Sequence, residues 1–195
     1  MKKLLLICGM TCLMYGASDD VIIKTLDEKP ELLEEVVDLW WSGQENAQKH
    51  VKPASRMITA MEKHLNHDTL PLCLIALKGE QLIGMARLVA TWTDDPAVAP
   101  KIAAHAPDVA KPGDDVWSPW LCGLIVHEKH RKQGVAHKLI VAIKEKARGL
   151  GHNVLYLGTK DTELELMYRR RGFVTFNEDS FRGHTEMLML CLLNK

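Results

Sequence analysis

Hydrophobic and polar residues alternate along this chain with two different periods, and the change of period marks the predicted elements. Residues 21–26 and 72–77 are short apolar runs, typical of strands. Between them, apolar residues recur every three or four positions, which predicts a helix opened by Pro30 and a second helix over 55–65. A polar connection containing glycine joins 72–77 to a further apolar run at 82–91, so these two runs are expected to form a hairpin.

The second half of the chain repeats this change of period around one basic turn. An apolar strand over 118–126 runs into an Arg-x-x-Gly-x-Ala sequence at 131–136. The three- and four-residue spacing that follows predicts a helix ended by Gly149, and 154–159 is expected to be a strand parallel to the first. Two more strands are predicted, over 173–176 and 185–193.

The basic turn has the properties of a polyphosphate site. A glycine-containing turn at a helix start leaves backbone N–H groups aimed at one point, where the helix dipole favours an anion. Gly134 lets the backbone approach, because a Cβ there would hold the phosphate off. A solvated basic loop is the alternative explanation of the surrounding charges, which are Lys129, His130, Arg131, Lys132 and Lys138. Neither a Gly-x-Gly-x-x-Gly fingerprint nor a Gly-Lys-Ser/Thr loop occurs, which argues against Rossmann and P-loop sites.

Composition is typical of an ordinary soluble enzyme domain. The chain has 195 residues, of which 47% are hydrophobic and 26% charged, enough to bury one sizeable core. Its formal net charge is zero, so bulk electrostatics give no indication of nucleic acid as a partner.

Three segments, in this order, resemble the acyl-CoA signature of the GNAT superfamily of N-acetyltransferases. They are the strand end at 124–126, the turn at 131–136, and Tyr168-x-x-x-Gly172-Phe173 at the end of a short helix. The resemblance covers about residues 21–195 and implies an α/β (α+β) fold. That fold is a mixed, mostly antiparallel sheet with a central splayed parallel strand pair and helices on both faces.

The resemblance also implies an activity, the transfer of an acetyl group from acetyl-CoA to an amine by direct attack in a ternary complex. Acetyl-CoA is then the cosubstrate, and no metal is expected. Tyr168 matches the family's general acid, although a core aromatic is the alternative, and Asp161 is nearest to a family Asn that touches the pantetheine arm. The pantetheine would lie along Leu124, Ile125 and Val126. The pyrophosphate would lie on Arg131, Lys132, Gln133, Gly134, Val135, Ala136 and His137.

The general base and the acceptor stay open at this point. Many relatives carry a Glu on the fourth strand, but 118–126 contains no carboxylate. His127 follows that strand and is the predicted base, since histidine titrates near neutral pH, although an exposed loop histidine is equally consistent. Asp94, Asp95, Asp114, Asp115, His184 or a chain of waters are further possibilities. The acceptor is expected to be a small-molecule amine or a peptide amine, and a homodimer is left open.

A different class of function is a non-catalytic CoA-binding or interaction module on the same fold, because fold does not fix activity. Tyr168 favours the enzyme. The connection over 94–116, rich in Pro and Ala, is expected to be either a substrate wall or a tolerated insertion.

The N-terminus raises the question of localisation. Residues 1–20 form a leader whose lysines and apolar run resemble a signal peptide, too short to span a bilayer comfortably. Three cysteines on predicted strands, Cys73, Cys122 and Cys191, cannot all pair with one another, which favours a reducing compartment. Acetyl-CoA is a cytoplasmic metabolite as well. We therefore expect a cytoplasmic domain over 21–195 without stable membrane insertion, while export stays open.

Overall fold

In the computed structural model the described residues are 20–43, 54–91, 118–181 and 184–193. The strands among them form one sheet in the order β1-β2-β3-β4-β5-β7-β6. The strands are β1 (Val21–Thr25), β2 (Leu72–Lys78), β3 (Gln81–Val89), β4 (Trp120–Val126), β5 (Val154–Thr159), β6 (Val174–Phe181) and β7 (His184–Leu192). The helices are α1 (Leu33–Ser42), α2 (Ala54–Glu62), α4 (Val135–Gly149) and α5 (Thr162–Arg169), with 3-10 turns η1 (Leu26–Glu28), η2 (Pro30–Leu32) and η4 (Glu128–His130).

The predicted order of elements and the mixed sheet are confirmed, with small shifts at helix ends. The strand predicted over 173–176 is longer and runs from Val174 to Phe181, because it pairs with β7 along that length. Pro30 opens a 3-10 turn, and the α-helix begins only at Leu33. The second helix ends at Glu62 instead of residue 65. There the N–H groups of His64 and Leu65 donate to carbonyls three residues back, which tightens the chain out of the α-helix.

Some predictions concern residues outside the described ranges. These are the leader up to residue 19 and the whole 94–116 connection with Asp94, Asp95, Asp114 and Asp115. Among the described residues, no helix is long and apolar enough to cross a membrane.

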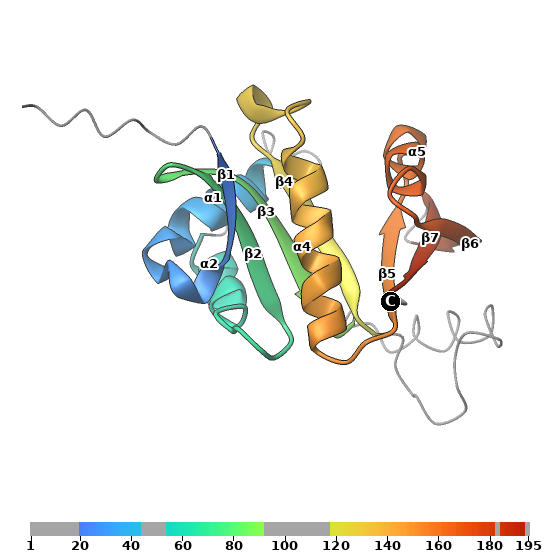
Figure 1. Ribbon diagram of the computed structural model, residues 1–195, viewed down its shortest axis with the longest axis horizontal. Coiled ribbons are helices and arrows are strands. Elements are labelled where there is room, and N and C mark those ends of the chain that lie inside the picture. Colours follow the sequence, from blue (N-terminus) through green and yellow to red (C-terminus); the bar gives the residue numbers. More distant parts are fainter. Residues whose placement is uncertain (1–19, 44–53, 92–117, 182–183, 194–195) are drawn as a thin grey trace, which may run out of the picture.

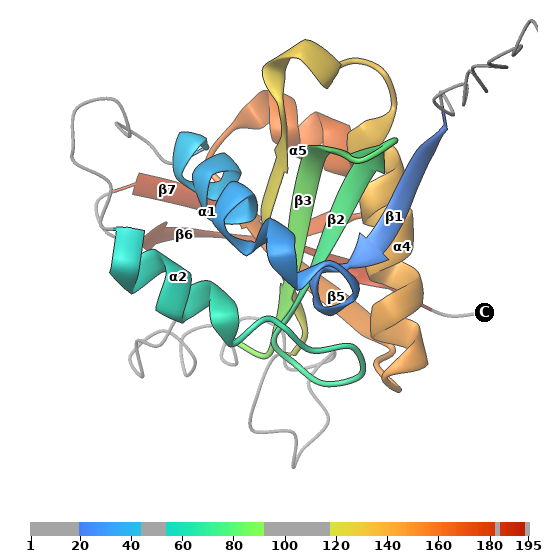
Figure 2. The same ribbon diagram turned by 90° about the vertical axis from the view of Figure 1, so that its left-hand side faces the viewer.

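Two hydrophobic cores lie on opposite faces of the sheet, because neighbouring side chains of a strand point to opposite sides. Leu72 and Leu74 of β2 pack with Leu139 of α4 in one core. Cys73 and Ile75 pack with residues of α1 and α2 in the other. Figures 1 and 2 accordingly show α4 on one side of the sheet and the α1–α2 pair on the other.

The parallel pair in the middle of the sheet touches at one end only. Trp120 of β4 and Tyr156 of β5 are the single pair in register, and the Tyr156 N–H donates to the Pro119 carbonyl at 3.0 Å. By contrast, β5 pairs with β7 from Val154 through Thr159. Figure 1 shows β4 and β5 starting close together and diverging toward η4 and α5. The splayed pair predicted from the family resemblance is therefore confirmed.

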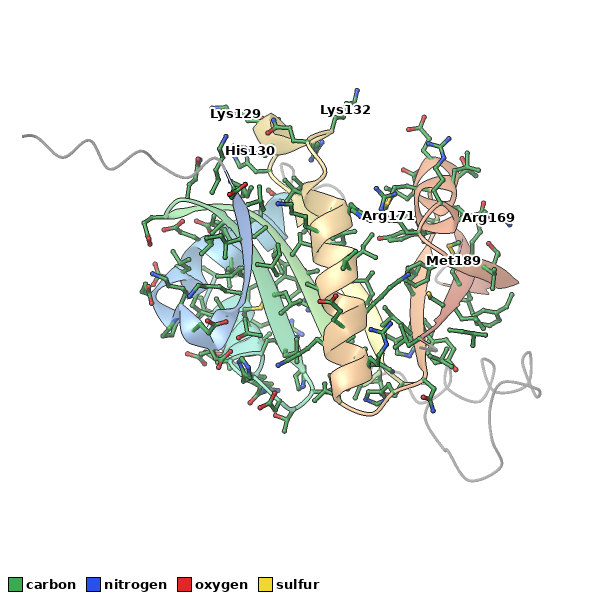
Figure 3. All side chains as sticks on the ribbon, viewed as in Figure 1. Lys129, His130, Lys132, Arg169, Arg171 and Met189 are labelled. Carbon is green, nitrogen blue, oxygen red and sulfur yellow. The ribbon has the colours of Figure 1, made fainter. Side chains whose placement is uncertain are left out.

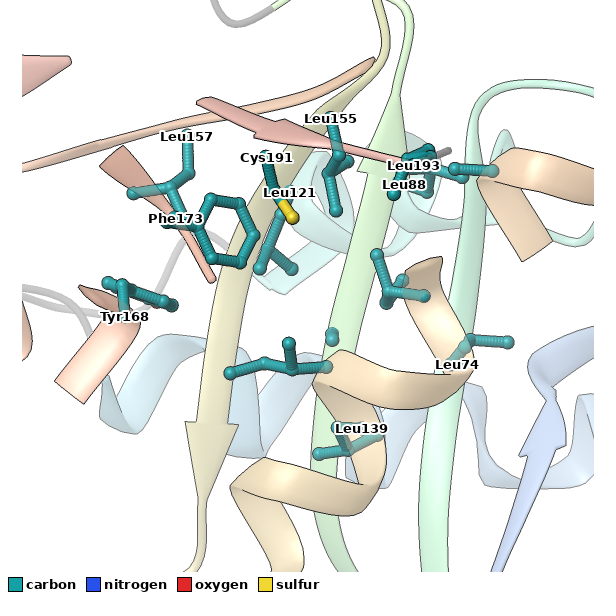
Figure 4. Packing of buried hydrophobic residues seen from close by; sticks show 14 of the residues in the cluster. Leu74, Leu88, Leu121, Leu139, Leu155, Leu157, Tyr168, Phe173, Cys191 and Leu193 are labelled. Atoms are coloured by element: carbon teal, nitrogen blue, oxygen red, sulfur yellow. The ribbon is translucent and has the colours of Figure 1, made fainter. Parts of the chain in front are cut away.

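Residues at the end of α5 pack into the hydrophobic core on the α4 face of the sheet, beside the divergence of β4 and β5. The rings of Tyr168 and Phe173 meet edge to face, with centroids 5.6 Å apart. Both rings are buried in the cluster that also holds Leu121 of β4 and Leu139 of α4 (Figure 4). Packing across the divergence thus positions α5 relative to β4.

Candidate active site

β4 contains a bulge at the place where it leaves β5. Cys122 lies opposite Arg87 of β3, but three residues further along, Ile125 lies opposite Met85, so β4 carries one extra residue. Gly123, within the bulge, has φ +59°, a conformation that favours glycine. A Cβ on Gly123 would also lie 2.9 Å from Nε of Arg87. A bulge leaves its extra residue outside the strand ladder, so backbone groups become available here.

Beyond the bulge, β4 has one open edge. Ile125 and Val126 pair with β3 on one side, whereas on the other side the described register with β5 ends at Trp120. The predicted pantetheine contacts at Leu124, Ile125 and Val126 therefore lie along a strand edge that can receive an extended chain.

Two side chains of the basic turn stabilise the turn by hydrogen bonds to nearby backbone carbonyls. Nε of Arg131 donates to the Val126 carbonyl at 3.1 Å, and Nε2 of Gln133 donates to the Lys129 carbonyl at 2.9 Å. Lys138, counted above among the charges around the turn, instead donates to the Val21 carbonyl at 3.2 Å. Lys129 and Lys132 extend outward near His130 at the tip, while Arg169 and Arg171 lie on the α5 side (Figure 3).

The backbone of the turn has the conformation that the predicted polyphosphate site would use. Gly134 caps α4 with φ +83°, and Lys132 also has a positive φ of 60°. Left-handed residues in a turn bring successive N–H groups toward one point. No backbone carbonyl of the described residues accepts from the N–H groups at 132–136. These donors at the start of α4, with Val135, Ala136 and the exposed His137, are therefore available to an anion.

Tyr168 is buried at the end of α5 and is directed toward β4. The pKa of its hydroxyl is raised to about 12, mainly by burial and also by the thiol of Cys122, while the charge of Arg171 opposes the change. The phenol therefore stays protonated at neutral pH. Asp161, predicted to touch the cofactor, caps the same helix, because its Oδ1 accepts from the N–H groups of Glu163 at 2.7 Å and Leu164 at 3.1 Å.

His127 lies away from this group, directly after β4. Its Nδ1 accepts from the Lys129 N–H at 3.4 Å, and its ring lies 6.0 Å from that of His130. It lines a separate cavity of about 600 Å³ with Asp38 and Glu128 among its walls. His184 is the first residue of β7.

Arg87 and Glu186 lie near Cys122, and the sequence analysis did not identify either of them. Burial raises the pKa of the Cys122 thiol to about 11, the nearby charge of Arg87 opposes this, and the charge of Glu186 adds to it. The neutral thiol of Cys122 thus lies near the cation of Arg87, the carboxylate of Glu186 and the phenol of Tyr168. A lone arginine inside an apolar strand was the available signal for Arg87. Among the described residues, no cluster of His, Cys, Asp or Glu could hold a metal ion.

The chain belongs to the acetyltransferase (GNAT) family, whose sequence profile matches residues 33–173. This match agrees with the fold and with the site geometry above.

Solved structures similar to this chain include acetyltransferases, some of them named as members of the GNAT family. One from Streptococcus pneumoniae has a TM-score of 0.63 at 16% identity, covering 90% of this chain and 100% of its own. The yncA protein from Salmonella typhimurium, solved with acetyl-CoA, has a TM-score of 0.60 at 13% identity and coverages of 90% and 95%. An aminoglycoside 6'-N-acetyltransferase complexed with coenzyme A has a TM-score of 0.62 at 13% identity and coverages of 89% and 98%. None of the curated proteins matches this sequence.

Proposed function

We propose that this protein is an acetyl-CoA-dependent N-acetyltransferase that passes the acetyl group directly to a bound amine. The observation that carries the proposal is the divergence of β4 from β5, with the Gly123 bulge on one side and the Tyr168 hydroxyl on the other. A thioester between them would meet backbone donors at its carbonyl and an acid at its sulfur.

The residues present fit acetyl-CoA at both ends of the site. The available N–H groups at 132–136 suit a pyrophosphate, and the open edge of β4 suits the amides of pantetheine. The structures of yncA and of the aminoglycoside 6'-N-acetyltransferase contain acetyl-CoA and coenzyme A, which supports the same donor here.

Each residue then has a defined part in the reaction. Backbone N–H groups at the bulge polarise the thioester carbonyl while the amine nitrogen attacks its carbon. As the new C–N bond forms and the C–S bond breaks, Tyr168 donates its proton to the departing sulfur. A base takes the proton that the amine loses, directly or through water.

We propose Glu186 as that base, because its charge acts on Cys122 next to the bulge. His127, the base predicted from the sequence, lines a different cavity and accepts from the turn backbone. The two assignments differ in the pH profiles expected for single variants, as described in the Discussion. Because acetyl-CoA is a cytoplasmic metabolite, we further propose that the protein acts in the cytoplasm.

A transfer assay tests the proposed function. The protein should release free thiol from acetyl-CoA only when a suitable amine is added, and mass spectrometry should find that amine heavier by one acetyl group. Amines of several classes belong in the panel, including peptides. Tight CoA binding without transfer to any amine would instead identify the non-catalytic module.

A further inference from the structure

A cavity of about 420 Å³ lies beside Cys122, on the face of the sheet that α1 and α2 cover. Its walls come from α1, the end of α2, β3 and β4, and include Trp40, His64, Arg87, Val89, Thr91 and Cys122. The cavity is large enough for a small organic molecule.

Arg87 is a largely buried cation in the wall of this cavity. Its guanidinium lies 4.3 Å above the ring centre of Trp40, which supports the charge through a cation–π contact. Its Nε is buried and finds no hydrogen-bond partner among the described residues, and no carboxylate of those residues forms an ion pair with it. Burying a cation without a partner is unfavourable, so a bound anion would satisfy it.

Among the residues that the structure describes, the titratable groups around Arg87 do not provide that anion. Burial raises the pKa of Cys73 to about 12 and of Cys122 to about 11, so both thiols stay neutral at neutral pH. His64 is neutral as well, since burial, followed by the charge of Arg87, lowers its pKa to about 4.

His64 adds a hydrogen-bond acceptor to the same cavity. Its Nδ1 lies 3.1 Å from the Ala60 carbonyl, which only accepts, so Nδ1 carries the hydrogen. Nε2 therefore has a lone pair, and this buried atom finds no partner among the described residues. The cavity thus combines a cationic donor with a neutral acceptor.

We propose that this cavity binds the carboxylate of the acceptor at Arg87, so that the amine acetylated belongs to an amino acid or a related amino-carboxylic acid. This inference rests on the proposed function. Arg87 lies opposite Cys122 in the strand register, and Cys122 directly precedes the bulge at Gly123. An acceptor whose carboxylate binds Arg87 is therefore held beside the reacting carbonyl. The carboxylate of Glu186 near Cys122 favours the ammonium end. A polycationic aminoglycoside would bring like charge to Arg87 and to Lys63 in the same wall.

The test compares matched acceptors. Twenty amino acids, the corresponding amino-acid amides and the aminoglycoside kanamycin are assayed with acetyl-CoA. At least one amino acid should exceed its amide by about 100-fold in kcat/KM, as expected when a buried charge pair loses one partner. Arg87→Met should reduce that preference to within about threefold, mainly by raising KM. Arg56→Met, which removes an exposed cation on α2, is the matched control and should keep the preference.

Equal rates for acid and amide, or a preference that survives in Arg87→Met, would overturn the inference and leave the transferase intact. If Arg87→Met does not fold, Arg87→Lys retains the charge without the forked donors, and it should raise KM for the amino acid about tenfold. An unchanged KM in that variant counts against the inference.

Direct binding separates this inference from the proposed function. The NMR signal of the His64 ring should shift saturably when the amino acids are added without acetyl-CoA. If no amine is acetylated but this shift occurs and disappears in Arg87→Lys or Arg87→Met, the transferase proposal fails and the carboxylate site stands. Absence of any shift and of any acid preference would overturn the site.

Discussion

Tyr168 of α5 lies close enough to Cys122 of β4 for the buried thiol to contribute to the raised pKa of the phenol. The two residues come from opposite sides of a strand pair that is in register only at Trp120 and Tyr156. The divergence therefore has a protonated phenol on one side and the bulged strand on the other, and the proposed thioester chemistry uses both.

Tyr168→Phe should lower kcat by about 100-fold with little change in KM for acetyl-CoA, because a proton donor used only in the transition state leaves ground-state binding alone. Steady-state kinetics measure both parameters. Tyr156→Phe removes a hydroxyl from a second buried tyrosine and serves as the control, with kcat close to that of the wild type. A kcat for Tyr168→Phe within about threefold of wild type, under 1 kcal/mol of barrier, would return Tyr168 to the role of a core aromatic.

The pH profile of kcat/KM should distinguish the two proposed bases. With a pKa of about 12, Tyr168 stays protonated below about pH 10, so it does not shape the profile in the usual range. Loss of activity toward low pH should therefore come from protonation of the base. We expect this limb to persist in His127→Gln and to disappear in Glu186→Gln, whose kcat/KM should fall by about 100-fold. The reverse result would assign the base to His127.

Gly134→Glu should abolish most CoA binding, measured by calorimetry, because a carboxylate at the start of α4 repels phosphate and blocks the N–H donors. Gly151→Glu is a matched control at the other end of α4. Both glycines have positive φ, +83° and +87°, and a Cβ on either meets no atom within 4 Å. Both variants should thus lose a similar stability, roughly 1 to 2 kcal/mol, from backbone strain. Equal CoA affinity in the two variants would contradict the turn assignment.

His64 should make the fold sensitive to acid. Its pKa is lowered from 6.5 to about 4 by burial, so between these values the unfolded chain binds a proton that the folded chain does not. Stability from this residue is complete above about pH 6.5 and decreases until about pH 4, by roughly 3 kcal/mol in total. Urea unfolding at pH 7.5 and 4.5 should show a smaller loss for His64→Gln than for wild type. The exposed His137→Gln should behave like wild type, and equal acid sensitivity of all three proteins would exclude this role for His64.

Features that depend on local order were predictable from the sequence. The helix over Val135–Gly149 follows from apolar residues at Leu139, Ile143 and Ala147, all buried on the α4 face of the sheet. The turn at Gly134 was predictable from the few residues around it, because a residue with a left-handed backbone conformation is usually a glycine. These properties involve neighbours a few residues apart, so periodicity and spacing reveal them.

The proposed acceptor side of the site depends on tertiary structure. Arg87 meets Cys122 only through the register of β3 with β4, and the bulge at Gly123 shifts that register by one residue. Glu186 lies near enough to Cys122 for its charge to act on the thiol only because β7 pairs beside β5. Sequence alone determined the elements, the family signature and the turn, since these rest on local patterns. Which charged and polar groups are buried together near Cys122 was decided by long-range pairing and by burial, which no short stretch of sequence contains.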